Sequence, residues 1–185
     1  GTPIVGICGG YQMLGREVQD PEHTESDLDK VMGLGLIDSI TIFEANKVTH
    51  QVKAAACGHK FLGINYSGDN LVGYEIHMGR TQFLSPVDPA FTIATRSGKE
   101  VQLNDGAVSA DGLVMGTYIH GIFDNDAYRR TVLDALRVRK GLAPLGVIQD
   151  TQARKDAAYN RLADVVRQSL DMELVYRIMN ENTGR

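Results

Sequence analysis

A cysteine flanked by glycines is the feature of this sequence that most directly suggests chemistry. Gly6-Ile7-Cys8-Gly9-Gly10 follows a short apolar run, residues 2–7, and precedes a helix-compatible stretch that ends at Gly15. Strand, glycine turn and helix is the setting in which the analogous G-x-S-x-G motif places a nucleophile at the apex of a sharp turn. A helix N-terminus favours the thiolate, and the backbone N–H of Gly9 can hold an oxyanion. The motif therefore predicts a nucleophile at Cys8.

Two other roles for the motif are a buried structural cysteine and a glycine-rich loop that binds phosphate. A cysteine in a core needs no glycines on both sides. The loop also lacks the third glycine of a dinucleotide-binding fingerprint and the Lys-Ser/Thr pair of a P-loop. The nucleophile is favoured over both alternatives.

A cysteine nucleophile needs a base, and the sequence offers five histidines. His120 follows an apolar strand, residues 114–119, and so stands at a strand end, where α/β enzymes place their active sites. Alternation puts Glu75 and His77 on one face of another strand. For that pair a plain surface face is as consistent with the pattern as a functional one. The other three histidines are expected to be solvated or structural: His23, His50 and His59.

The hydrophobic pattern predicts an α/β fold with a mixed sheet and with helices gathered at the C-terminus. The run 2–7 is expected to be a central strand buried on both faces. Further strands are expected at 35–43, 48–56, 71–83 and 90–95, and a hairpin with an Asp-Gly turn joins 107–109 to 113–119. Helices are expected at 127–141, capped by Asp124 or Asn125, and at 151–170 and 171–179. The acidic segment 16–30 is expected to be an exposed excursion.

Composition excludes several classes of protein. The chain has 185 residues, enough for one domain, and its 43% hydrophobic and 23% charged residues exclude a wholly disordered chain. A net charge of −4 provides no basic field, so nucleic acid is not an expected partner. No apolar stretch reaches the roughly 20 residues that span a bilayer and no signal peptide opens the chain, which predicts a cytoplasmic protein with no membrane partner. Cys8 and Cys57 are expected to be thiols, and no metal is expected.

Three segments, 6–15, 73–81 and 116–124, resemble the glutamine amidotransferase domain of the cobyric acid synthase family, and the resemblance extends over nearly the whole chain. It implies a class I (triad-type) amidotransferase fold, a flavodoxin-like mixed sheet with a cysteine elbow. It further implies that Cys8 is the nucleophile, that His120 is its base and that Gly9 donates to the oxyanion. The residues implied to bind substrate are Gly10, Gln12, Tyr74 and His77.

One feature departs from the wider class, in which Pro-Glu follows the histidine and the glutamate orients the imidazole. Gly121 and Ile122 occupy those positions here. Either Cys8 and His120 act as a dyad or another acid orients the ring. Glu75 is the candidate for that acid, because the resemblance places it within a family motif.

The resemblance also implies the reaction and its partners. Glutamine is hydrolysed through a thioester on Cys8, and the ammonia passes to an ATP-dependent synthetase that amidates adenosylcobyrinic acid a,c-diamide in cobalamin biosynthesis. Residues 1–185 contain no phosphate-binding sequence. The glutaminase portion is therefore expected to need no cofactor, while ATP, magnesium and the corrinoid substrate are expected in a separate N-terminal synthetase domain.

Two other functions remain open: the glutaminase portion of the related a,c-diamide synthase, and a binding domain that has kept the fold without the activity. The tail segments 161–164 and 170–171 favour the resemblance to the cobyric acid synthase family over the a,c-diamide synthase. Residues 1–185 are interpreted as one amidotransferase domain that lacks its upstream strands and, with them, a second oxyanion donor. The isolated chain is accordingly expected to have little or no activity.

Overall fold

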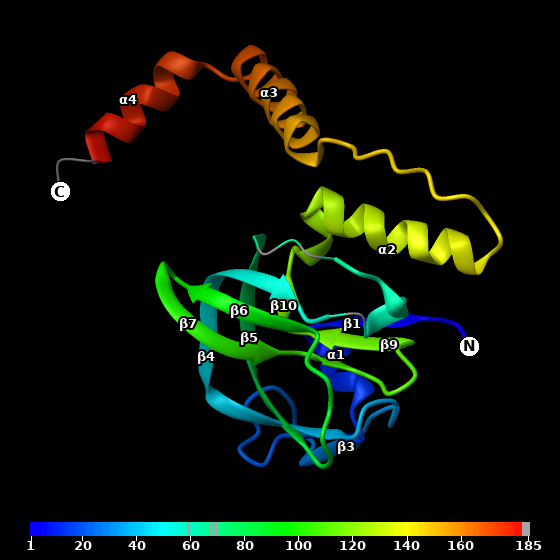
Figure 1. The fold of residues 1–185 in the computed structure, drawn as a ribbon. Coiled ribbons are helices and arrows are strands. Elements are labelled where there is room, and N and C mark those ends of the chain that lie inside the picture. Colours follow the sequence, from blue (N-terminus) through cyan, green and yellow to red (C-terminus); the bar gives the residue numbers. More distant parts are fainter. Residues whose placement is uncertain (59, 67, 69, 183–185) are drawn as a thin grey trace. The chain divides into compact units, whose positions relative to one another are not determined.

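The computed structural model describes residues 1–58, 60–66, 68 and 70–182, and the chain forms two compact units, Gly1–Ile148 and Gln149–Arg185 (Figure 1). The strands of the first unit are β1 (Ile4–Ile7), β2 (Glu17–Gln19), β3 (Lys30–Met32), β4 (Ser39–Ala56), β5 (Leu71–Phe83), β6 (Phe91–Arg96), β7 (Lys99–Asp105), β8 (Ala107–Val108), β9 (Val114–Thr117) and β10 (Ile119–His120). Its helices are α1 (Gly9–Leu14), α2 (Asp126–Arg139) and the short 3-10 turns η1 (Phe61–Gly63) and η2 (Ile122–Asp124). The second unit contains α3 (Thr151–Ser169) and α4 (Met172–Asn182).

The strands form two sheets that together contain parallel and antiparallel pairs. The smaller sheet has the order β1-β9-β8, with β1 and β9 parallel. The larger has the order β10-β5-β4-β2-β3, and β6 and β7 extend it from β4. In it β2 and β4 are parallel, while β4 and β5 are antiparallel. The predicted α/β fold with a mixed sheet is confirmed.

The strand that leads into the cysteine differs from its expected position. All four residues of β9 are buried, whereas Ile4 and Val5 of β1 are each 37% exposed. Among the described residues β9 is the one strand that pairs with β1. The prediction of a central strand at 2–7 is therefore wrong for the described residues, because an apolar run predicts burial without specifying what covers it.

Three other segments also differ from expectation. The two strands expected at 35–43 and 48–56 form the single strand β4, which is bulged between Phe43 and Val48. The segment 16–30 includes β2 and the start of β3, and its Asp20 is only 2% exposed. The Asp20 carboxylate accepts backbone hydrogen bonds from residues 24–26, which folds this polar segment back on itself. Strand β7 was not predicted, since its alternation rests on only two apolar residues, Val101 and Leu103.

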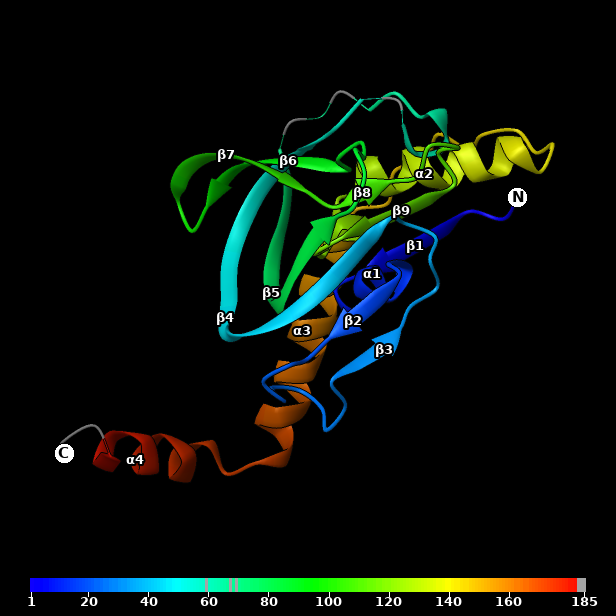
Figure 2. The ribbon, with the colours of Figure 1, turned by 90° about the horizontal axis from the view of Figure 1, so that it is seen from below.

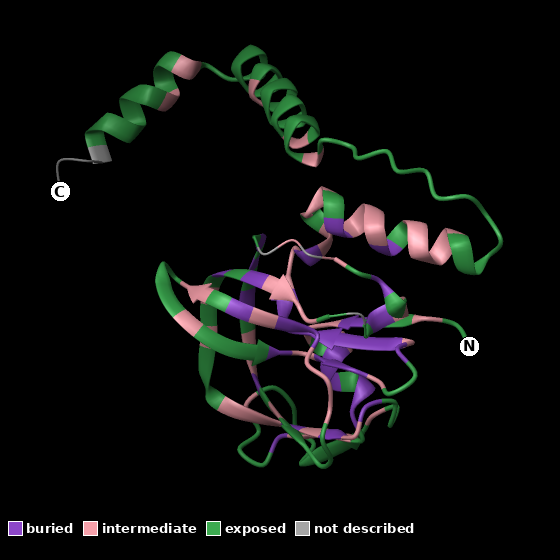
Figure 3. Ribbon diagram, viewed as in Figure 1, coloured by how far each residue is buried: buried purple, intermediate pink, exposed green. Residues whose placement is uncertain are grey.

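Helix α2 closes the larger core cluster through Tyr128 and Val132, which are 1% and 5% exposed. Asn125 occupies the predicted N-cap position, yet its side chain bonds the backbone of Val72 in both directions at 2.9 Å instead of capping the helix. Buried residues gather around β9, β10 and α1 (Figure 3). Within the part of the chain that the structure describes, no helix is long and apolar enough to cross a bilayer.

Candidate active site

Cys8 lies in a strained turn between β1 and α1. Its backbone has φ 54° and ψ −114°, a conformation that is costly for any residue other than glycine and that clusters at functional sites. A Cβ at Gly6 would lie 2.6 Å from the carbonyl oxygen of Gly10, so glycine at position 6 lets α1 cross closely over β1. α1 packs against β1 beside β2 (Figure 2). The cysteine elbow predicted from the sequence is thus the observed local geometry.

The neighbouring strand β9 holds the elbow from the other side. The backbone N–H of Cys8 donates to the carbonyl of Thr117 at 2.9 Å, at the end of the parallel β1–β9 pair. A Cβ at Gly116 would lie 2.0 Å from the ring of Tyr11 in α1, so glycine at this position is required for the helix to reach its place. Tyr11 in turn packs edge-on against Tyr118, with ring centroids 5.0 Å apart. Cys8 is therefore held by contacts to β9 as well as by its own turn.

His120 lies beyond the same strand, after the chain has changed sheets. β9 ends at Thr117, and residues 119–120 pair with β5, which places His120 opposite Tyr74. The rings of His120 and Tyr74 stack at 5.0 Å with an interplanar angle of 7°. A Cβ at Gly73 would lie 2.5 Å from the His120 carbonyl oxygen, so this pairing depends on glycine in β5.

Cys8 and His120 both contact β5, two residues apart along the strand. The Cys8 thiol donates to the carbonyl of Ile76 at 3.4 Å, and the His120 ring lies on Tyr74, two residues earlier on the same strand face. Two residues of a strand span about 7 Å. The buried Nε2 of His120 has no hydrogen-bond partner among the described residues, and the Cys8 thiol donates to Ile76. Catalytic hydrogen bonds often tighten only when substrate binds.

The glycines after Cys8 leave the space above the elbow open. A Cβ at Gly9 or at Gly10 would meet no atom within 4 Å, so packing does not require either glycine. Gly9 is the first residue of α1, and its N–H therefore has no acceptor within the helix. The Gln12 side chain is buried between α1 and β5. Its amide nitrogen would lie 2.5 Å from a Cβ added at Gly79 of β5.

Glu75 does not lie with His120. The register pairs His120 with Tyr74, so the side chain of Glu75 projects from the opposite face of β5. There its carboxylate accepts two hydrogen bonds from Arg96, at 2.8 and 2.9 Å, and its Oε1 is 3.7 Å from Nε2 of His77. Burial favours a raised pKa for Glu75, but the contacts with His77 and Arg96 outweigh it and hold the pKa below its usual range. The geometry leaves Cys8 and His120 without this carboxylate as an orienting group.

Asp105 is a buried acid that holds the strand end between the two catalytic candidates. It is 6% exposed, and its carboxylate accepts from the hydroxyl of Thr117 and from the backbone N–H of Tyr118. The Thr117 hydroxyl also accepts from the N–H of Ile119 at 3.0 Å. Burial, the largest effect, raises the pKa of Asp105 to about 6. These contacts set the bend at which the chain leaves β9 and enters β10.

A cavity of about 540 Å³ lies on the Glu75 side of β5. That volume falls in the range of small-molecule pockets. Its described lining includes Tyr11, His77, Arg80, Arg96, Asp105 and Tyr118. His77 stacks on Tyr118 at 3.9 Å, while Tyr74 is on the other strand face with His120. The predicted substrate-binding residues Tyr74 and His77 are therefore separated by the sheet.

The other candidates have ordinary surroundings. The Cys57 sulfur is 3.1 Å from the hydroxyl of Thr92, His50 bonds Ser97, and His23 bonds the carbonyl of Ser26. His59 lies outside the described residues. The described part of the chain contains no group of three or more His, Cys, Asp or Glu side chains arranged to hold a metal ion.

Sequence reasoning missed Arg96 and Asp105. Arg96 lies 21 residues from Glu75, and only the pairing of β5 and β6 with β4 brings them together. Asp105 ends a strand that the pattern did not predict. One signal in the sequence could have indicated Asp105: it is a single acid that directly precedes the apolar hairpin beginning at Gly106-Ala107-Val108.

Comparisons with known proteins identify relatives of this chain. Residues 1–128 match the model of the CobB/CobQ-like glutamine amidotransferase domain. A cobyric acid synthase from Streptococcus sanguinis is 45% identical over 181 residues, which are 97% of this chain and 34% of that protein. One from Moorella thermoacetica is 45% identical over 180 residues, again 97% and 34%, and one from a Thermoanaerobacter species is 43% identical over 180 residues, 97% and 36%. The chain thus spans about a third of the length of these relatives.

Proposed function

The chain belongs to the CobB/CobQ-like glutamine amidotransferase family, and from that membership we propose that it is the glutamine-hydrolysing part of a cobyric acid synthase. The observation that carries the proposal is the strained Cys8 turn at the end of β1, hydrogen-bonded to the strand that leads to His120. The relatives described above are cobyric acid synthases, which favours this function over that of the related a,c-diamide synthase.

In the proposed reaction the Cys8 thiolate attacks the side-chain amide carbon of glutamine, forming a C–S bond and an oxyanion. The N–H of Gly9 stabilises that oxyanion. His120, carrying the thiol proton, gives it to the amide nitrogen as the C–N bond breaks, so ammonia leaves and a thioester remains. His120 then removes a proton from water, whose oxygen attacks the thioester carbon. The C–S bond breaks and glutamate leaves, while the proton stays on His120 or passes to the Cys8 thiolate.

We propose that Cys8 and His120 act as a dyad within this chain. The positions that carry Pro-Glu in the wider class are Gly121 and Ile122, and Ile122 is fully buried in the core. Glu75 is bound to Arg96 on the far side of β5. The ring of Tyr74 stacks on the His120 imidazole, and we propose that this contact orients it.

The remaining steps are assigned to the part of the synthase outside this chain. Ammonia would be consumed there in the amidation of a corrinoid carboxylate driven by ATP and magnesium. We further propose that residues outside this chain cover β1, since Ile4 and Val5 are each 37% exposed and the described residues give β1 one partner strand. The same residues would supply the second oxyanion donor, because in folds with this elbow that donor follows an earlier strand.

The test is glutamine hydrolysis by the assembled protein and by this chain alone. Cys8→Ser is expected to abolish glutamate release and to leave use of free ammonia intact, while the matched variant Cys57→Ser keeps both. The isolated chain is expected to be slower by roughly 10²–10³-fold, the usual effect of a lost oxyanion donor. Glutamate release that survives Cys8→Ser would overturn the proposal, and full activity of the isolated chain would overturn the assignment of the second donor.

A further inference from the structure

The chain passes between its two sheets at Asp105 and again at Thr117, and these two crossings lie side by side. β7 ends at Asp105 in the larger sheet, and β8 begins at Ala107 in the smaller one. β9 ends at Thr117 in the smaller sheet, and β10 begins at Ile119 in the larger one. The Asp105 carboxylate joins the crossings, because it accepts from the Thr117 hydroxyl and from the N–H of Tyr118. We call Asp105 and Thr117 the crossing pair.

A glycine allows the two crossings to approach one another. Gly106 has φ 71°, and a Cβ at this position would lie 2.1 Å from the carbonyl oxygen of Gly116 in β9. Any side chain here would therefore push the crossings apart. As a result the crossing pair is buried, with Asp105 6% and Thr117 0% exposed. Buried polar groups of this kind depend on their protein partners for hydrogen bonding.

Thr117 is hydrogen-bonded toward both catalytic candidates. Its carbonyl accepts from the backbone N–H of Cys8 at 2.9 Å. Its hydroxyl oxygen accepts from the N–H of Ile119 at 3.0 Å, and Ile119 directly precedes His120. A hydroxyl has one proton to donate, and here Asp105 accepts it, which turns a lone pair of the oxygen toward Ile119. One residue thus tethers both the Cys8 turn and the strand that carries His120.

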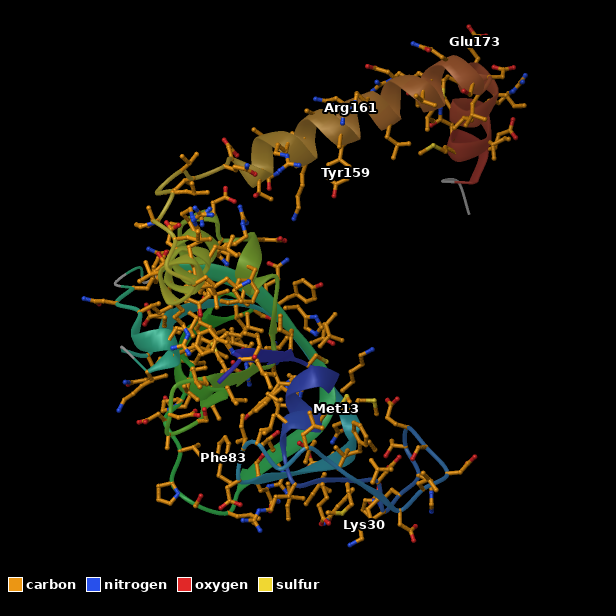
Figure 4. The ribbon with its side chains drawn as sticks, turned by 90° about the vertical axis from the view of Figure 1, so that its right-hand side faces the viewer. Met13, Lys30, Phe83, Tyr159, Arg161 and Glu173 are labelled. Carbon is orange, nitrogen blue, oxygen red and sulfur yellow. The ribbon has the colours of Figure 1, made fainter. Side chains whose placement is uncertain are left out.

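The side chain of Tyr118 packs the bend between β9 and β10. Its ring stacks on His77 at 3.9 Å and meets Tyr11 of α1 edge-on at 5.0 Å, and its hydroxyl is 2.8 Å from that of Thr81. Met13, two residues after Tyr11, lies on the exposed side of α1 with an exposed fraction of 58% (Figure 4). The bend is therefore packed through a side chain and hydrogen-bonded through its backbone.

The carboxylate of the crossing pair is not needed for packing alone. Burial raises the pKa of Asp105 to about 6, so the ionised form lowers stability at neutral pH. Replacing both members of a buried hydrogen-bonded pair with apolar groups of the same shape is often neutral or stabilising. Departures from such local rules are expected at functional sites. The location of this pair, between Cys8 and His120, indicates which function it serves.

We propose that the crossing pair is a positioning device for glutamine hydrolysis, which holds Cys8 and His120 at the separation and orientation that proton transfer between them requires. This inference rests on the proposed function for the identity of the reaction. Asp105 and Thr117 act through the backbone of the two strand ends and not by touching glutamine. A displacement of about 1 Å between reacting groups can slow a reaction by roughly 10²-fold. Loss of either side chain should therefore affect kcat more than KM.

The test is glutamine hydrolysis by variants of the assembled protein. Thr117→Val removes the hydroxyl and keeps the shape, and the matched control Thr117→Ser keeps the hydroxyl. Asp105→Asn probes the pair from the other side, because an amide has one acceptor oxygen where a carboxylate has two. Thr117→Val and Asp105→Asn are each expected to lower kcat by roughly 10–100-fold with KM for glutamine nearly unchanged, while Thr117→Ser stays close to native. The double variant should be no slower than the slower single variant, since both changes remove the same interaction.

Two further measurements separate positioning from damage to the fold. Amidation with free ammonia is expected to remain native in every variant. Alkylation of Cys8 by iodoacetamide, with Cys57 as the internal reference, should slow in Thr117→Val, and its pH profile should move to higher pH because a displaced His120 no longer favours the thiolate.

Native kcat in either folded single variant would overturn the proposal, as would additive losses in the double variant or an equal fall in ammonia-dependent amidation. If Thr117→Val does not fold, Asp105→Asn decides the same question. A native protein that does not hydrolyse glutamine would refute the proposed function. In that case, Cys8 alkylation that slows in Thr117→Val and not in Thr117→Ser would leave the control of Cys8 by the crossing pair standing.

Discussion

Arg96 holds the Glu75 carboxylate through two hydrogen bonds, at 2.8 and 2.9 Å, on the face of β5 away from the stacked rings of Tyr74 and His120. The carboxylate is almost fully buried, while 28% of the Arg96 side chain is exposed. A bidentate pair of this kind joins β5 to β6 across β4. Glu75, the acid within the 73–81 segment, is thus bound to Arg96 in a structural ion pair.

Glu75→Gln is expected to destabilise the fold more than it slows the chemistry. Removing one partner of a largely buried ion pair leaves Arg96 uncompensated, and the free energy of unfolding should fall by about 2 kcal/mol or more. Urea unfolding measures this. The matched control is Glu44→Gln, which breaks the exposed pair with Arg80 and should cost less than about 1 kcal/mol. Unchanged stability together with lost glutaminase activity would return Glu75 to the catalytic machinery.

His120→Ala is expected to reduce glutamine hydrolysis by the assembled protein by roughly 10²–10⁴-fold, the range for a lost general acid–base. Amidation with free ammonia should continue nearly unchanged, because that step bypasses Cys8. Both rates are measured on the same preparation. An equal fall in both would show that His120 supports the fold instead of the thioester chemistry.

Two glycines near the elbow should respond in opposite ways to alanine. At Gly116 the added Cβ would lie 2.0 Å from the Tyr11 ring, so Gly116→Ala should lower the free energy of unfolding by about 1–3 kcal/mol and slow alkylation of Cys8. At Gly10 the Cβ meets nothing within 4 Å, so Gly10→Ala should leave stability unchanged or raise it by up to about 1 kcal/mol. Because Gly10 borders the open space above Cys8, the same change should raise KM for glutamine. Thermal unfolding and glutaminase kinetics distinguish the two, and equal destabilisation would contradict the packing described for α1.

Asp105 should give the fold a component of stability that is lost as pH rises. Burial raises its pKa to about 6 from an ordinary 3.8, so the folded state favours the protonated form. The corresponding stability is complete below about pH 3.8 and is lost as pH rises through 6; the difference amounts to roughly 3 kcal/mol. Asp105→Asn lacks this group, so the stability of the variant relative to the native chain should increase by about that amount between pH 4 and pH 7.

Comparison of the native chain with Asp105→Asn isolates the contribution of Asp105. Other acids, such as Glu75 and Asp20, have lowered pKa values, so the stability that they contribute is lost as pH falls. Glu75 and His77 both face Asp105, the first raising its pKa and the second lowering it. Urea unfolding at intervals across this pH range is the measurement. Parallel stability curves for the native chain and Asp105→Asn would show that the carboxylate is not held protonated by the fold.

The sequence by itself determined the features that depend on local geometry. A glycine-flanked cysteine between an apolar run and a helix-forming segment specifies a tight turn, and the observed turn has Cys8 at φ 54°. Local sequence patterns likewise predicted four other elements. Polar–apolar alternation indicated β5, the Asp-Gly turn indicated the β8–β9 hairpin, and helical spacing of apolar residues indicated α2 and α3. His120 at a strand end followed from the same kind of pattern.

Only the tertiary structure decided which side chains meet. The bend after Thr117 moves the chain from one sheet to another, and the resulting register sets His120 opposite Tyr74 and Glu75 on the reverse face. A shift of one residue in that pairing would exchange the two faces, and nothing near Glu75 in the sequence specifies the register. Arg96 and Asp105 reach the site through strand pairings between segments far apart in the chain. Their roles are a property of packing, which local pattern does not encode.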